Sequence, residues 1–143
     1  MSSSTGKKSH RKGKTGEREF ANVIYRLTGG QVELQRNLNQ CRTGGDDLTG
    51  YANFSIEVKR WKTASDALVR DWWSQCQSNA HKLKKVPVLA YRADHQGWKV
   101  AMHPNYHFPE KDVEGCLTMS ADLFAKYLMD PENGLPDLTQ RSA

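Results

Sequence analysis

Three charged residues in the middle of the sequence, Asp47, Glu57 and Lys59, have types and a spacing that suit metal-dependent chemistry. Glu57 and Lys59 lie two residues apart in an alternating segment of strand character, which places both side chains on one face, about 7 Å apart. Asp47 lies upstream, before a segment expected to hairpin back onto the Glu57 strand. Carboxylates, together with a backbone carbonyl such as that of Val58, are the oxygen ligands that Mg²⁺ prefers. Lys59 could orient a water molecule or stabilise charge that develops on a phosphate.

The acidic pair Asp46 and Asp47 leaves two candidates for the second carboxylate ligand. Mg²⁺ requires several oxygens in near-octahedral geometry, so Glu57 alone is seldom sufficient. The preceding Gly44-Gly45 allows the backbone to approach closely at this point. We favour Asp47 because it directly precedes the apolar Leu48, and Asp46 remains the alternative.

The elements that must position these residues follow from hydrophobic periodicity. The order helix, three strands, helix, two strands predicts an α/β fold with a mixed sheet flanked by helices, followed by a C-terminal helix. The expected N-cap is Thr15 for the first helix, Ser65 or Thr63 for the second, and Ser120 for the third. The expected helices span residues 15–27, 63–84 and 120–129, and the expected strands span residues 31–36, 48–51, 54–60, 86–91 and 98–102.

Charge and composition divide the chain into three parts. Residues 1–14 are rich in Ser, Gly, Lys and Arg and are expected to form a flexible basic arm. Residues 15–103 are expected to form the core, and residues 104–143 an acidic C-terminal extension with one helix. The chain carries a net charge of +5, and the excess of Lys and Arg falls in the first 103 residues, which favours a polyanionic partner such as nucleic acid.

Four short motifs occur in an order and at spacings that resemble a known nuclease family. They are Arg11-Lys12-Gly13 followed by Glu17-Arg18-Glu19, then Asp47-Leu48, then Ile56-Glu57-Val58-Lys59, and finally Pro87-Val88-Leu89-Ala90 with Trp98. The ordered set is similar to the PD-(D/E)xK nucleases, and more narrowly to the archaeal-type Holliday junction resolvases and their phage relatives. The resemblance extends from Arg11 to Met102 and leaves out the acidic extension.

This resemblance implies a restriction-endonuclease-like fold, Mg²⁺ as cofactor with Mn²⁺ as a substitute, and a homodimer that cuts four-way DNA junctions symmetrically. It implies that Asp47 and Glu57 hold the ions, that Glu17 is a helix-borne ligand of metal or water, and that Lys59 is catalytic. It also implies that Arg18 and an arginine after the first strand, either Arg36 or Arg42, engage phosphate. Arg11 and Lys12 in the basic segment, and Arg60 and Lys62 after the Glu57 strand, are further candidates for phosphate contacts.

Other interpretations of the sequence are less favoured. Gly13-Lys14-Thr15 resembles the end of a P-loop but has Lys8 where that loop needs glycine, so no nucleotide cofactor is expected. The three cysteines form no CxxC pair and are expected to be buried free thiols. No apolar run suits a membrane span or a secretory signal, which predicts a cytoplasmic protein, in the host cytoplasm if phage-encoded.

The helix expected at residues 63–84 carries two further candidates. Trp72 is expected in the core, whereas Trp73 falls on another face and is the better candidate for a partner surface. Gln75 could support the active site. Two competing functions stay open, a nicking or repair endonuclease acting on flap, duplex or damaged DNA, and a non-catalytic DNA-binding module with the same fold.

Overall fold

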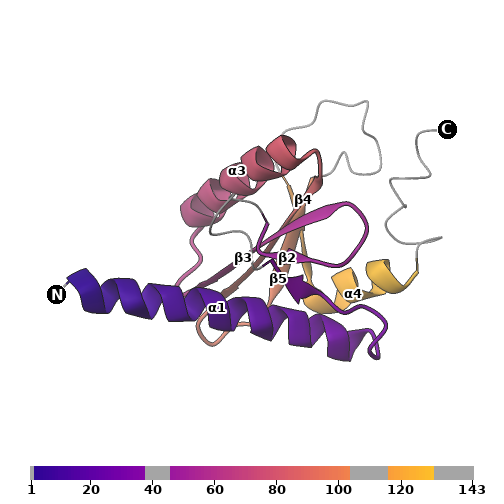
Figure 1. Cartoon of the computed structure of the whole chain (residues 1–143), viewed down its shortest axis with the longest axis horizontal. Coiled ribbons are helices and arrows are strands. Elements are labelled where there is room, and N and C mark those ends of the chain that lie inside the picture. Colours follow the sequence, from indigo (N-terminus) through magenta and orange to yellow (C-terminus); the bar gives the residue numbers. More distant parts are fainter. Residues whose placement is uncertain (1, 38–45, 104–115, 131–143) are drawn as a thin grey trace.

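The computed structural model describes the backbone of residues 2–37, 46–103 and 116–130, and the side chains of these residues from position 15 onward. One mixed six-stranded sheet, in the order β1-β2-β3-β4-β5-β6, forms the centre of the molecule (Figure 1). The helices are α1 (Ser2–Leu27), α3 (Asp66–Leu83) and α4 (Ala121–Met129). The strands are β1 (Gln35–Arg36), β2 (Leu48–Thr49), β3 (Phe54–Trp61), β4 (Val86–Ala93), β5 (Lys99–Met102) and β6 (Leu117–Ser120). The predicted α/β class is confirmed, and the predicted elements occur in the predicted order, with β6 as one strand that was not predicted.

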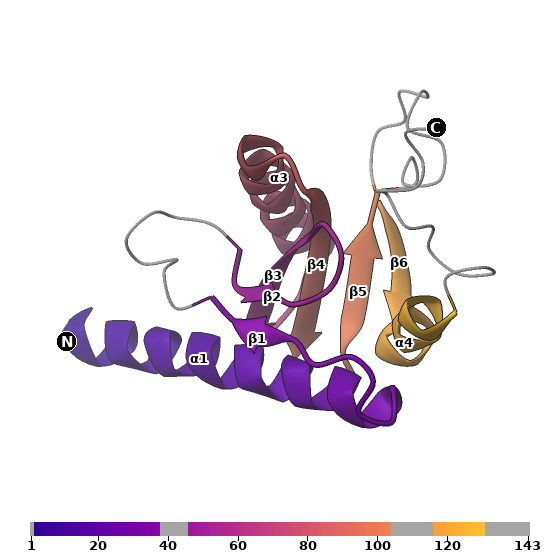
Figure 2. The same ribbon diagram turned by 45° about the vertical axis from the view of Figure 1, so that its right-hand side comes forward.

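Helices cover both faces of the sheet. α1 and α4 lie on one face and α3 on the other, as the two views together show (Figures 1 and 2). Alternation along β3 divides its side chains between the two layers, because successive side chains of a strand point to opposite faces. Ile56 and Val58 join the larger core beneath α1 and α4, where Phe20 and Phe124 also pack. The opposite face of β3 is therefore left to the polar residues Ser55, Glu57 and Lys59.

The centre of the sheet is the parallel pair of β3 and β4, connected by α3. Each residue of β3 from Phe54 to Trp61 has a partner on β4. On its other side β3 pairs with β2 only through Leu48 and Ile56, so β3 extends well past the short β2. Beyond this pair, β3 has no strand partner on that side among the described residues, and Glu57 and Val58, where the predicted chemistry lies, are in this part of the strand.

The N-terminal segment differs from the prediction. Residues 2–14, which we expected to form a flexible arm, belong to α1, and the helix begins at Ser2 rather than near Thr15. The segment contains no proline, and its lysines and arginines have favourable helix propensity. Extending a helix that is already nucleated by its packed part costs far less than starting a new one, which explains the continuation.

The C-terminal boundary and one interior position also differ. The predicted core ended at residue 103, but β6 pairs with β5 along its length and α4 packs on the same sheet. β6 alternates apolar and polar residues, but it is only four residues long and mostly exposed, so its pattern is a weak signal for a strand. Trp73, expected on a partner surface, is 5% exposed and packs in the α3 layer beside Trp72.

The predicted caps at Ser65 and Ser120 are confirmed, because their side-chain oxygens accept hydrogen bonds from Leu68 N and Leu123 N. Among the described residues, no helix has an apolar stretch of the length needed to cross a bilayer.

Candidate active site

Asp47 lies at the edge of β3, where β2 has not yet begun. Its backbone N–H donates to the Ile56 carbonyl at 2.9 Å, and its side-chain Oδ2 accepts a hydrogen bond from Val58 N at 2.8 Å. The carboxylate thus accepts from one N–H of β3 in the place of a neighbouring strand, which satisfies this buried backbone donor. This arrangement fixes the Asp47 carboxylate next to the Glu57-Val58 peptide.

Glu57 points from β3 toward α3 and is almost fully buried, with 8% of its surface exposed. Asn79 of α3 donates from Nδ2 to Glu57 Oε1 at 2.9 Å, which holds one carboxylate oxygen in a fixed position. Lys59 is half-buried and follows Glu57 on the same face, as alternation predicts. Sequence reasoning proposed Gln75 as the supporting residue of α3, but Gln75 is exposed and Asn79, one turn further on, makes the contact.

The pKa of Asp47 reflects its burial and the negative charges near it. Burial raises the pKa of Asp47 to about 8, with a further increase from the negative charge of Glu57 and a smaller one from Glu17.

Burial also raises the pKa of the Cys76 thiol, and Glu57 adds to that shift. Cys76 is thus a buried neutral thiol beside the carboxylates, consistent with its predicted role as a free cysteine. Cys116 is free and half-buried, and Cys41 lies outside the described residues.

Glu17 reaches this region from α1 on the opposite layer. Its Oε2 accepts a hydrogen bond from Arg36 Nε at 2.8 Å, and only 7% of its side chain is exposed. Gly16 allows the approach, because a Cβ at this position would lie 2.7 Å from the Arg60 Cβ of β3. Glu17 therefore acts on Asp47 through its charge, while its carboxylate is engaged by Arg36.

Substituting Gly16 by Ala is expected to push α1 away from β3, because the new methyl would lie well inside the normal carbon–carbon contact distance of about 3.5–4 Å. Overpacking of this kind costs about 1–3 kcal/mol, partly offset by the better helix propensity of alanine, about 1 kcal/mol. Urea unfolding of Gly16→Ala measures this loss. Gly97→Ala is the control, since a Cβ at Gly97 meets nothing within 4 Å. Equal stability of both variants would contradict the close packing of α1 on β3.

Asp46 is separated from this group by its own partners. It is 2% exposed, accepts from Asn37 Nδ2 at 3.0 Å, and forms an ion pair with Lys85 Nζ at 2.8 Å. Its two carboxylate oxygens each have a partner away from Glu57. Of the two aspartates left open by the sequence, Asp47 is the one that the structure brings together with Glu57.

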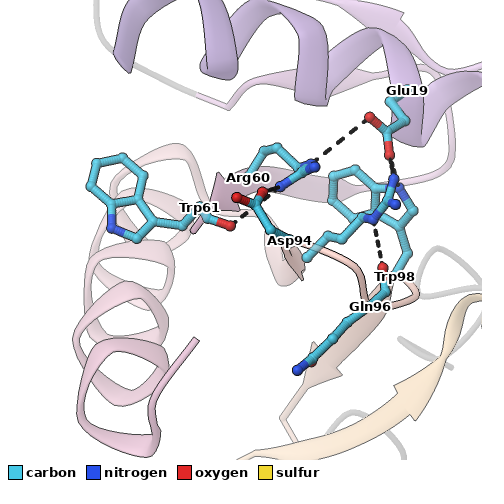
Figure 3. Close-up of polar contacts among 7 residues, drawn as sticks. Glu19, Arg60, Trp61, Asp94, Gln96 and Trp98 are labelled. Carbon is cyan, nitrogen blue, oxygen red and sulfur yellow. Dashed lines mark hydrogen bonds and ion pairs between the residues drawn. The ribbon is translucent and has the colours of Figure 1, made fainter. Parts of the chain in front are cut away.

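A second polar network joins α1 to the C-terminal ends of β3 and β4 (Figure 3). Glu19 accepts from Trp98 Nε1 at 3.1 Å and forms an ion pair with Arg92. Arg60 pairs with Asp94 and approaches Glu19 at 3.9 Å. The network occupies the guanidinium of Arg60, which the sequence suggested as a phosphate contact.

The remaining candidates for phosphate contact have different surroundings. Arg18 on α1 and Lys62 after β3 are exposed, whereas Arg36 is engaged by Glu17. Arg42 lies outside the described residues, as do the side chains of Arg11 and Lys12.

The donor chemistry of the group fits a hard divalent cation. Asp47 and Glu57 supply carboxylates, and Mg²⁺ is commonly held by one or two carboxylates while it keeps several water molecules. A cation would also relieve the repulsion that raises the pKa of Asp47. Within the described ranges, no three His, Cys, Asp or Glu side chains converge as a ready-made metal site. Two carboxylates together with a backbone oxygen such as that of Val58 are therefore the set that fits.

The raised pKa of Asp47 predicts that the metal-free protein loses stability as the pH rises. The folded state keeps this proton up to about pH 8, whereas an unfolded aspartate releases it near 3.8. The stabilisation is therefore complete below pH 3.8 and is lost as the pH rises through about 8. Thermal unfolding in EDTA from pH 5 to 9 should show Asp47→Asn gaining relative to the parent protein, by roughly 3 °C for each kcal/mol in a domain of this size. A constant difference across this range would contradict the assignment.

Comparison with known proteins identifies an endonuclease family. The sequence matches the phage PDDEXK endonuclease family over residues 8–122. The solved structure of Hjc from Archaeoglobus fulgidus, a Holliday junction resolvase from an archaeal hyperthermophile, is similar over 73% of this chain and 83% of its own, with 14% identity and a TM-score of 0.40. No curated protein matches the sequence.

Proposed function

Because the chain belongs to the phage PDDEXK endonuclease family, we propose that it is a Mg²⁺-dependent, structure-selective endodeoxyribonuclease that resolves four-way DNA junctions. The observation that carries this proposal is the placement of Asp47 and Glu57 side by side where β3 extends past β2, with Lys59 next to Glu57 on the same face. A DNA-binding module without activity would have no use for clustered carboxylates, because they repel the phosphates of its partner.

Each residue of the group would have a distinct part in the reaction. Asp47 and Glu57 would hold the cation, and Asn79 would keep one oxygen of Glu57 in place. A bound Mg²⁺ polarises a phosphoryl oxygen and lowers the pKa of a coordinated water molecule. Lys59 would hold the attacking water or stabilise the negative charge that develops on the phosphate. Glu17, tied to Arg36, would contribute negative charge from the other side of the β3 edge.

The junction substrate is the more specific part of the proposal. It is supported by the ordered set of four motifs between Arg11 and Met102 and by the basic character of the first 103 residues. Two symmetric cuts across a four-way junction need two identical active sites, and a twofold-symmetric homodimer provides them. Of the candidates for phosphate contacts named from the sequence, Arg18 and Lys62 are the described residues with exposed side chains.

Cleavage of end-labelled four-way junctions in Mg²⁺, with the cut positions mapped, tests this function. We expect paired cuts at symmetric positions on opposing strands, and little cleavage of a linear duplex of the same sequence. Single nicks in the duplex would instead support a nicking or repair endonuclease. The absence of cleavage of any DNA in both Mg²⁺ and Mn²⁺ would contradict the nuclease activity itself.

A further inference from the structure

Trp61 continues the row of side chains that contains the two active-site residues of β3. Glu57, Lys59 and Trp61 lie at two-residue intervals, so all three point to the same face of the strand, each about 7 Å from the next. Exposure rises along this row. Glu57 is 8% exposed, Lys59 is half-buried, and Trp61 is 42% exposed. The row therefore leads outward from the buried carboxylate to an exposed indole at the end of the strand.

The backbone at Trp61 is held in place although its side chain is exposed. Arg60 Nη1 donates to the Trp61 carbonyl at 3.2 Å, and Asp94 N donates to the carbonyl of Lys62 at 3.3 Å. Trp61 is also in register with Ala93 of β4. The Arg60 side chain lies on the α1 side, and the Trp61 indole points away from the network of Arg60, Asp94 and Glu19 (Figure 3). Arg60 thus acts as a positioning residue, and the indole is presented on a rigid base.

A large aromatic surface in such a place suits a base better than it suits the core. Tryptophan is rarely left this exposed without a partner, and its rigid ring loses little entropy on contact. Lys62, the next residue in the chain, is exposed, and its positive charge would attract a phosphate of the DNA backbone. Stacking of a base on an aromatic ring tolerates any sequence, as a structure-selective enzyme requires.

We propose that Trp61 is a stacking platform for a nucleobase that has lost its neighbour in the DNA stack, as at a branch point beside the scissile phosphate. This inference rests on the proposed nuclease function and adds a residue that determines preference for branched over continuous DNA. A continuous duplex offers the indole no free base face, so stacking favours a junction and leaves duplex binding unchanged.

The test compares junction and duplex binding in EDTA, where no metal-dependent cleavage takes place. Fluorescence anisotropy gives the two Kd values, and 2-aminopurine at the branch point reports on stacking. We expect Trp61→Ala to weaken junction binding about tenfold, as the loss of one base stack would. Duplex binding should stay within about twofold, Trp61→Phe should keep most of the junction affinity, and the 2-aminopurine quenching should disappear only in Trp61→Ala. Tyr25→Ala is the matched control, because Tyr25 is an aromatic residue of α1 with 50% exposure.

Equal losses for junction and duplex, or no loss for either, would overturn the proposal. A change in the oligomeric state of Trp61→Ala, measured by sedimentation, would also overturn it by assigning the indole to a protein contact. The binding readout is independent of cleavage. A parent protein that binds junctions through Trp61 but cuts no DNA would contradict the nuclease function alone, whereas a protein that cuts junctions equally well without Trp61 would contradict the stacking role alone.

Discussion

Substitution of Glu57 by Gln is expected to lower the rate of metal-dependent DNA cleavage by about a thousandfold or more, while DNA binding persists. Glutamine keeps the length of the side chain and the oxygen that accepts from Asn79 Nδ2. It removes the negative charge that a divalent cation requires. Because Glu57 also raises the pKa of Asp47, the metal-free variant should be at least as stable as the parent protein.

Single-turnover cleavage of a labelled junction, together with anisotropy for binding, measures the effect of Glu57→Gln. Glu33→Gln is the control, since Glu33 is an exposed carboxylate that lies before β1. Cleavage by Glu57→Gln within tenfold of the parent rate would show that the carboxylate of Glu57 does not take part in catalysis.

The same substitution is expected to lower the cleavage rate when it is made at Asp47 and to lower the stability when it is made at Asp46. Asp47→Asn keeps the acceptor for Val58 N but loses the charge next to Glu57, so cleavage should fall by about a thousandfold. Asp46→Asn leaves the carboxylate group beside β3 intact and removes the ion pair with Lys85. Its cleavage rate should stay within a few-fold, and its stability should fall by about 1–3 kcal/mol, because the Lys85 ammonium loses its carboxylate partner and faces a buried amide instead.

Cleavage rates well below the unfolding temperature, paired with urea unfolding, separate these two effects. The reverse pattern, with activity lost in Asp46→Asn and kept in Asp47→Asn, would transfer the proposed ligand role to Asp46.

Much of this site could be predicted from short-range patterns. Alternation along residues 54–60 placed Glu57 and Lys59 on one face, because the strand period leaves no other choice once Ile56 and Val58 are buried. Helix periodicity and capping residues located α3 and α4 to within a few residues. These predictions depend only on local geometry, which is why they hold.

Long-range contacts set the limit of the prediction. Asp46 and Asp47 are neighbours of the same type, and the choice between them depends on the pairing of Leu48 with Ile56 and on Lys85, far along the chain. Asn79 follows Cys76 by three residues on the same helix face, a spacing that could have indicated it, but its contact with Glu57 depends on how α3 crosses β3.

The engagement of charged side chains was the least predictable feature. Arg36 and Arg60 were predicted to contact phosphate, because the sequence shows where a positive charge is. It does not show whether an acidic side chain of the same protein lies next to that charge. Glu17 and Asp94 come from distant segments and pair with these arginines in the structure.

The central claim is that Asp47 and Glu57 together hold a divalent cation, and Mn²⁺ binding followed by electron paramagnetic resonance tests it most directly. The free ion gives a strong signal that decreases on binding, so the parent protein, Asp46→Asn, Asp47→Asn and Glu57→Gln can be titrated side by side without DNA. We predict binding by the parent protein and by Asp46→Asn, and loss of binding in both Asp47→Asn and Glu57→Gln. Equal Mn²⁺ binding by all four proteins would contradict the assignment of the metal site to these two carboxylates.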